Sequence, residues 1–150
     1  MFYTDETDLH HCPDIGRIFH IIGKQSEIDS PGKGGKPKYI IGSVEYPIGD
    51  GLYEIYNHKR HQEFRAHLEH LMEMYPDDFL FVIRDNASEH VTPMLDEFLI
   101  ANINRLCLVP LPTYSPHLNL VDTIWRYMRD EVTRNYFYIT FKEKCEAWVK

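Results

Sequence analysis

Apolar and polar residues alternate along this chain in patterns that predict strands first and then alternating helices and strands. Runs of strand length predict strands at 1–7, 39–44, 52–56, 79–83 and 106–109, with a further short candidate at 17–22. Apolar spacings of three and four residues predict helices at 61–75, from 92–93 to about 101, from about 119 onward, and at 142–149. This order predicts an α/β fold in which helices cover the faces of a mixed sheet.

Three of these segments carry predictions about burial. The unbroken apolar runs at 79–83 and 106–109 predict strands that are buried on both faces. The helix at 61–75 has an apolar face, with the histidines of this region on its solvated face: His58, His61, His67 and His70. The last long helix has a stripe that predicts a core position for its tryptophan: Leu118, Val121, Trp125, Met128 and Val132.

Composition and charge narrow the class of protein. The 150 residues fit one domain, and Asp and Glu outnumber Lys and Arg by 23 to 16, which gives a net charge of −7. A stand-alone nucleic-acid binder is usually basic, so any nucleic-acid contact is expected to be local or supplied by a partner. The three cysteines form no Cys-x-x-Cys pair, and neither a signal peptide nor a membrane span is apparent, which favours a reduced cytoplasmic protein.

A basic segment rich in glycine and proline precedes the strand predicted at 39–44. It covers residues 26–38 and carries Lys33, Lys36 and Lys38. A phosphate-binding P-loop is excluded, because Pro37, and neither Ser nor Thr, follows Lys36. The composition favours a solvated hairpin loop, and contact of its lysines with DNA is the alternative.

Three aspartates lie where an α/β sheet gathers functional side chains. Asp5 ends or follows the first predicted strand, Asp85 directly follows the run at 79–83, and Asp122 lies beside the apolar stripe of the last long helix. Carboxylates brought together repel one another unless a cation lies between them, and such hard oxygen ligands select Mg²⁺ or Mn²⁺. Each aspartate also has an ordinary interpretation, since Asp5 and Asp85 fit turns and the Asn119-x-x-Asp122 spacing fits a helix cap.

Two longer motifs surround the second and third aspartates. Residues 84–90 read Arg-Asp-Asn-Ala-Ser-Glu-His, and residues 111–122 read Leu-Pro-Thr-Tyr-Ser-Pro-His-Leu-Asn-Leu-Val-Asp, with Trp125 shortly after. Both motifs resemble the signature of the DDE transposases, most closely that of the mariner superfamily and its bacterial insertion-sequence relatives. The segment Tyr3-Thr4-Asp5-Glu6 is similar to the first-acid motif of this family, so the likeness covers nearly the whole chain.

The resemblance implies a ribonuclease H-like fold, which is a five-stranded mixed sheet flanked by helices. It also implies that Asp5, Asp85 and Asp122 bind two Mg²⁺ or Mn²⁺ ions and catalyse DNA cleavage and strand transfer at transposon ends. The supporting positions are Glu6, Asn86, His90 and Asn119. The basic residues proposed for DNA contact are Lys33, Lys36, Lys38, Arg126 and Arg129.

Departures from the family pattern leave alternatives open. Asp122 stands where most bacterial relatives have Glu, although mariner elements use Asp, and Leu120 replaces the usual proline at the helix start. Four residues precede Asp5, so the chain is expected to be a single catalytic domain (1–150) without the helix-turn-helix region, which a separate region or reading frame would supply. A homodimer is left open. The alternatives are a ribonuclease H-like nuclease that does not join strands and a catalytically inactive transposase remnant.

Overall fold

Five strands form one mixed sheet in the order β3-β2-β1-β4-β5. The strands are β1 (Phe2–Leu9), β2 (Lys38–Glu45), β3 (Gly51–Tyr56), β4 (Leu80–Arg84) and β5 (Leu106–Pro110). β1 pairs antiparallel with β2 and parallel with β4, so the first strand of the chain lies at the centre of the sheet. The computed structural model describes residues 1–24, 27–32, 34–85, 92–112, 115 and 118–149.

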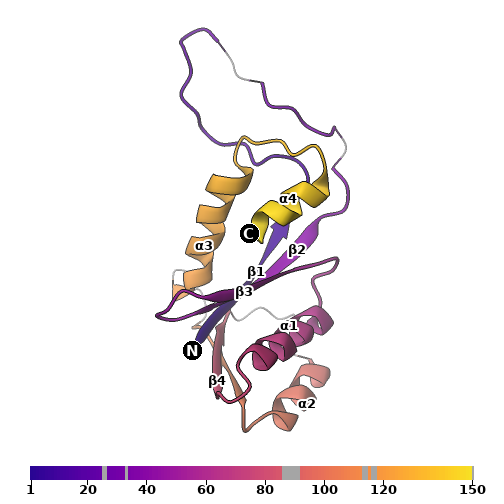
Figure 1. Cartoon of the computed structure of the whole chain (residues 1–150), viewed down its shortest axis with the longest axis vertical. Helices are drawn as coiled ribbons and strands as arrows, with labels where there is room; N and C mark the ends of the chain where they lie inside the picture. Colours follow the sequence, from indigo (N-terminus) through magenta and orange to yellow (C-terminus); the bar gives the residue numbers. More distant parts are fainter. Residues whose placement is uncertain (25–26, 33, 86–91, 113–114, 116–117, 150) are drawn as a thin grey trace.

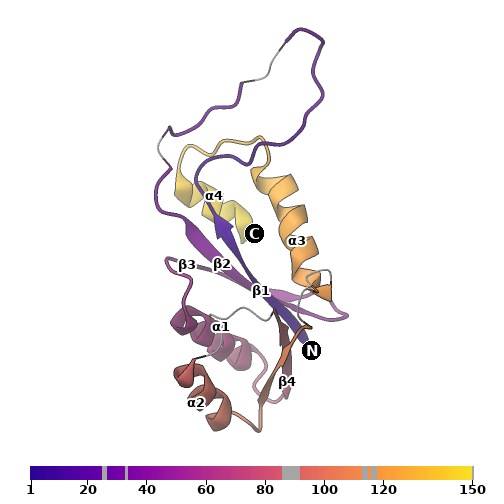
Figure 2. The same ribbon diagram turned by 180° about the vertical axis from the view of Figure 1, so that it is seen from behind.

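Helices cover both faces of the sheet (Figure 1 and Figure 2). One face carries α1 (His61–Met74) and α2 (Pro93–Ala101), and the other carries α3 (Leu120–Met128), the π-helix η3 (Arg129–Thr133) and α4 (Phe141–Trp148). Side chains of β1 alternate between the two hydrophobic clusters, because Phe2 packs with α1 and α2 while Leu9 packs with α3 and α4. The predicted α/β architecture with a five-stranded mixed sheet is therefore confirmed.

Local capping explains where three of the helices begin. The Thr92 hydroxyl accepts a hydrogen bond from the Leu95 N–H, and Pro93 occupies the first position of α2. At α4, Thr140 and Glu143 form a reciprocal capping box. The Asn119 side chain accepts from the Val121 N–H at 3.3 Å, so Asn119 caps α3, which begins at Leu120, close to the predicted start near Asn119.

The strand predicted at 17–22 is wrong. The described part of the connection between β1 and β2 projects beyond the sheet (Figure 1), and Phe19 and Ile22 are fully exposed. β1 is already paired with β2 and β4, and β2 with β1 and β3, so another strand finds no open edge beside them. The start of the connection is anchored, since the Asp14 N–H donates to the Thr133 carbonyl and Lys144 Nζ donates to the Cys12 carbonyl.

Burial of β4 and β5 on both faces is also contradicted. Leu80 and Val82 are buried, but Phe81 is 48% exposed and Val109 is 38% exposed. The reason is that α3 packs on β1 and β2, so it leaves the same face of β4 and β5 less covered. Among the described residues, no helix is long and apolar enough to cross a membrane.

Candidate active site

The sheet brings Asp5 and Asp85 to neighbouring positions. Thr4 of β1 lies opposite Arg84 of β4 in parallel register, so the next residue of each chain segment is an aspartate. Asp5 lies within β1 and does not end it as predicted, because β1 stays paired with β2 as far as Leu9. Both aspartates are half-buried. Side chains at matched positions of parallel neighbours point to the same face, so Asp5 and Asp85 share one side of the sheet near its centre.

Asp122 approaches the same region from α3. It lies in the first turn of that helix and is exposed. The helix start is tied to β1, because the buried Asn119 side chain lies within 3.5 Å of the Thr4 carbonyl oxygen, to which its Nδ2 donates. Asp5 and Asp122 consequently line one pocket of about 290 Å³, together with Glu6, Thr7, Trp125, Arg126, Arg129, Asp130 and Arg134.

The pKa of Asp5 is affected by both of the other aspartates. The pKa of Asp5 is raised to about 6, chiefly by burial and further by the negative charges of Asp85 and Asp122, while a hydrogen bond from the Glu6 backbone N–H opposes the rise. A hydrogen bond from the Trp125 indole again lowers the pKa. Asp5 therefore interacts electrostatically with both other aspartates.

The donor chemistry of these three carboxylates fits a hard divalent cation. Carboxylate oxygens are the ligands that Mg²⁺ and Mn²⁺ prefer, and a cation would relieve the repulsion that raises the pKa of Asp5. As they stand, no three His, Cys, Asp or Glu side chains within the described ranges lie close enough together to hold a metal ion. The three aspartates thus interact through space without converging on one point.

Basic residues border the acidic side of this pocket. Arg126 is exposed, and Arg129 donates to the Thr7 hydroxyl at 2.6 Å, while Arg134 forms an ion pair with Asp130. All three arginines line the pocket: Arg126 belongs to α3, as Asp122 does, Arg129 is the first residue of η3, and Arg134 directly follows η3. The pocket therefore places positive charge beside the carboxylates in a chain whose net charge is negative.

The other predicted site residues have different surroundings. Glu6 lines the pocket, and its carboxylate pairs with Lys59 Nζ at 3.4 Å. Lys36 is exposed, and Lys38 donates to the Asn57 side chain at 2.5 Å, away from the pocket. Three further predicted residues lie outside the described residues: Lys33, Asn86 and His90.

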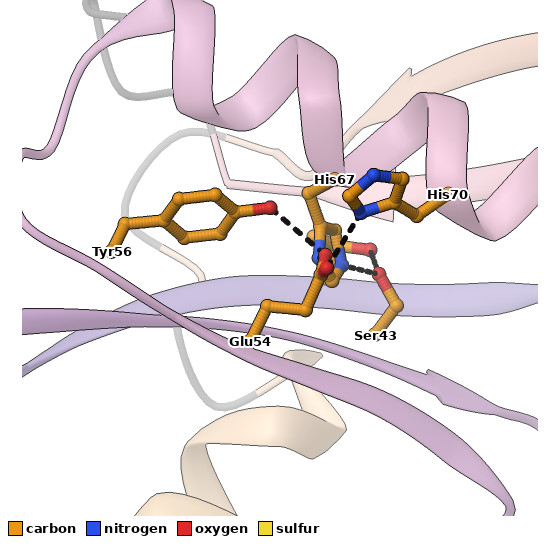
Figure 3. A network of polar contacts seen from close by, with 6 residues as sticks. Ser43, Glu54, Tyr56, His67 and His70 are labelled. Carbon is orange, nitrogen blue, oxygen red and sulfur yellow. Dashed lines mark hydrogen bonds and ion pairs between the residues drawn. The ribbon is translucent and has the colours of Figure 1, made fainter. Parts of the chain in front are cut away.

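A buried polar network on the opposite face of the sheet was not predicted (Figure 3). His67 of α1 places Nε2 2.8 Å from Ser43 Oγ and Nδ1 2.6 Å from Glu54 Oε2. Glu54 also contacts His70 Nδ1 at 2.6 Å and accepts from the Tyr56 hydroxyl. The predicted solvated position of His67 is wrong, because the residue is fully buried.

This network has the connectivity of a Ser-His-Glu triad but not its accessibility. Both Ser43 and His67 are fully buried, and the Ser43 hydroxyl also shares a 2.6 Å hydrogen bond with Thr4. Burial lowers the pKa of His67, so the neutral ring donates from Nδ1 to the Glu54 carboxylate and accepts at Nε2. A nucleophile must reach its substrate, so we assign the network to holding α1 on the sheet.

Comparison with known sequences identifies relatives along most of the chain. A family model described as "DDE superfamily endonuclease" matches residues 1–144. The "Insertion element IS630 uncharacterized 39 kDa protein" of Shigella sonnei is 29% identical over 137 residues, which are 91% of this chain and 39% of that protein. The "Uncharacterized protein y4pE/y4sA" of Sinorhizobium fredii is 29% identical over 117 residues, which are 75% of this chain and 83% of that protein. The chain thus spans about two fifths of the first relative.

Solved structures share the arrangement of strands and helices. The "Mos1 transposase paired-end complex with left transposon end" has a TM-score of 0.71 at 16% identity, covering 99% of this chain and 47% of that chain. The Mos1 mariner paired-end complex with Mn has a TM-score of 0.70 at 15% identity, with coverages of 99% and 47%. The catalytic domain of Mos1 mariner transposase has a TM-score of 0.59 at 14% identity, with coverages of 99% and 68%. At these identities the likeness establishes the fold, and the predicted ribonuclease H-like fold is confirmed.

Proposed function

This chain belongs to the DDE superfamily endonuclease family, and from that premise we propose that it is a mariner-type transposase catalytic domain, which cleaves DNA at transposon ends and joins them to target DNA. The observation that carries the proposal is the position of the three aspartates. Asp5 and Asp85 directly follow the last matched residues of the parallel β1–β4 register, Thr4 and Arg84, and Asp122 shares a pocket with Asp5. All three positions coincide with the acids of the motifs that resemble this family.

Asp5, Asp85 and Asp122 would hold the metal in this proposal. If bound there, two Mg²⁺ or Mn²⁺ ions would supply an activated water or hydroxyl and would stabilise the leaving oxygen of a phosphodiester. The carboxylates of this chain supply oxygen ligands on a rigid sheet and helix, and Asn119 fixes the start of that helix against β1. Substrate phosphates commonly complete such sites, which agrees with carboxylates that interact without converging in the protein alone.

DNA is the proposed partner, and the arginines of the pocket are the proposed phosphate contacts. One of the similar Mos1 structures is a paired-end complex with the left transposon end, and in this chain three arginines line the same pocket as Asp5 and Asp122. Because the chain as a whole is acidic, we assign sequence-specific recognition of the ends to a separate region or partner. In this proposal residues 1–150 form one catalytic unit that acts on DNA in a prokaryotic cytoplasm.

A joining assay separates this proposal from its two alternatives. The protein, together with the region or partner that recognises the transposon ends, is incubated with Mn²⁺, supercoiled plasmid and a labelled duplex that carries the inverted repeats flanking its own gene. We expect nicked plasmid and labelled DNA joined to it, both of which EDTA abolishes. Nicking without joined product would identify a hydrolytic nuclease, and neither product would identify an inactive remnant.

The Arg126→Gln variant tests the proposed phosphate contact. Arg126 is exposed beside Asp122, and its Nη2 lies 3.5 Å from the Thr123 hydroxyl, so its removal leaves the fold intact. We expect weaker binding to duplex DNA and a decrease of roughly 0.9 in the slope of log affinity against log salt, because one phosphate contact is lost. Fluorescence anisotropy at several salt concentrations measures both.

Lys142→Gln is the matched control for Arg126→Gln. Lys142 is also a cationic helix residue, and its side chain is 85% exposed on α4, outside the pocket. Its substitution is expected to leave the slope at the wild-type value. Equal slopes for Arg126→Gln and the wild-type protein would refute the contact.

A further inference from the structure

The indole of Trp125 holds one oxygen of a proposed metal ligand. Trp125 Nε1 donates to Asp5 Oδ2 at 3.1 Å across the space between α3 and β1. The tryptophan is 5% exposed and belongs to the hydrophobic cluster beneath α3 and α4. The sequence predicted this core position correctly but gave no indication of the polar contact.

The sheet has room for the Trp125 ring because position 42 is a glycine. Gly42 of β2 lies opposite Asp5 in the antiparallel register. A Cβ atom at position 42 would lie 2.5 Å from Trp125 Cη2, which is closer than van der Waals contact allows. Tyr53 of β3 packs edge-on against the same ring, with centroids 5.9 Å apart. The indole is therefore held in one orientation over Gly42, with its N–H directed at the carboxylate.

The second tryptophan of the chain provides an internal comparison. Trp148 of α4 lies in the same cluster, with its ring centroid 6.0 Å from that of Trp125. Its Nε1 is buried and has no hydrogen-bond partner among the described residues. Burial in this cluster thus does not by itself provide an indole with a polar partner, and the contact between Trp125 and Asp5 is specific.

We propose that Trp125 is a positioning residue, which holds Oδ2 of Asp5 and so keeps Oδ1 as the oxygen available to a metal ion. This inference rests on the proposed function. An unrestrained carboxylate rotates among several orientations, and a fixed donor on one oxygen removes that freedom before a cation arrives. In this role Trp125 acts through Asp5.

Paired tryptophan substitutions test the proposal. Trp125→Phe keeps an aromatic ring but removes the N–H that reaches Asp5, whereas Trp148→Phe makes the same chemical change where the N–H is unpartnered. Mn²⁺ affinity is measured by titration of the free-ion EPR signal, with and without duplex DNA. We expect binding about tenfold weaker in Trp125→Phe, the magnitude typical for partners of metal ligands, and wild-type affinity in Trp148→Phe.

The outcomes distinguish this inference from the proposed function. Equal Mn²⁺ affinity in both variants and the wild-type protein overturns the role of Trp125 and leaves the transposase proposal standing. A wild-type protein that binds no Mn²⁺ with or without DNA overturns both. Equal weakening in the two variants assigns the effect to packing and also overturns the positioning role.

An NMR experiment that keeps Trp125 tests the proposal even if the Trp125→Phe protein does not fold. The two indole N–H resonances are followed by NMR during titration with Mg²⁺ and after the substitution Asp5→Asn. We expect the Trp125 resonance to move in both experiments by more than that of Trp148. A Trp125 resonance that is unchanged by Asp5→Asn shows that the hydrogen bond is absent and overturns the proposal.

Discussion

Replacing Asp85 with asparagine is expected to lower the rate of metal-dependent DNA cleavage by a factor on the order of 10³ or more. A metal ion contributes several kcal/mol to the stabilisation of charge in the transition state, and each 1.36 kcal/mol corresponds to a factor of ten. Asparagine has the shape of aspartate but lacks the negative charge that a divalent cation requires. The initial rate of plasmid nicking in Mn²⁺ measures the effect.

The fold of the Asp85→Asn protein is expected to be retained. Asp85 is half-buried at the end of β4, and the substitution removes one of the charges that raise the pKa of Asp5. Asp77→Asn is the matched control, because it makes the same change at an exposed position before β4. A variant at position 85 that cleaves DNA at the rate of the Asp77→Asn control contradicts the assignment.

Periodicity was sufficient to predict the elements that build the site. The apolar runs and helical spacings indicated the strands that carry Asp5 and precede Asp85, and Asn119 marked the start of the helix that carries Asp122. These signals are local, since capping and alternation depend on residues a few positions apart. The parallel pairing of β1 with β4, which places two aspartates side by side, was not predicted beyond the expectation of a mixed sheet.

The incorrect predictions concern long-range relations that periodicity does not encode. His67 has the spacing of the buried face, three residues after Phe64, but a histidine there was predicted to be solvated. Its burial depends on polar partners from two other elements, Ser43 and Glu54. The exposure of Phe81 depends on where α3 packs, and the failure of 17–22 to form a strand depends on the occupied edges of β1 and β2. In each case the deciding contact joins residues far apart in sequence.

Replacing Glu54 with glutamine is expected to lower the free energy of unfolding by about 1.5–3 kcal/mol near pH 6, the range for hydrogen bonds to charged groups. The Glu54 carboxylate accepts from Tyr56 and contacts both His67 and His70, whereas one amide oxygen cannot replace all of these contacts. His67 is fully buried, so a lost partner is not replaced by water. Urea unfolding followed by circular dichroism measures the loss.

The same substitution is expected to change how stability depends on pH. Burial raises the pKa of Glu54, but hydrogen bonds from His67, His70 and Tyr56 outweigh it and lower the pKa to about 2, from 4.5 when unfolded. A carboxylate with a lowered pKa stabilises the fold above its unfolded pKa, and this contribution is lost as the pH falls from 4.5 towards 2. The difference in stability between the wild-type and Glu54→Gln proteins should therefore shrink across that interval.

His70 adds a change of opposite sign at higher pH. The hydrogen bond and charge of Glu54 raise the pKa of this exposed histidine above 6.5, so its contribution is present at lower pH and is lost as the pH rises through the raised value. The difference between the two proteins should thus be largest between about pH 5 and the raised pKa of His70. Glu97→Gln, at an exposed position of α2, provides the control. If the free energy of unfolding of the Glu54→Gln protein equalled that of the wild type at every pH, the polar network on α1 would not stabilise the fold.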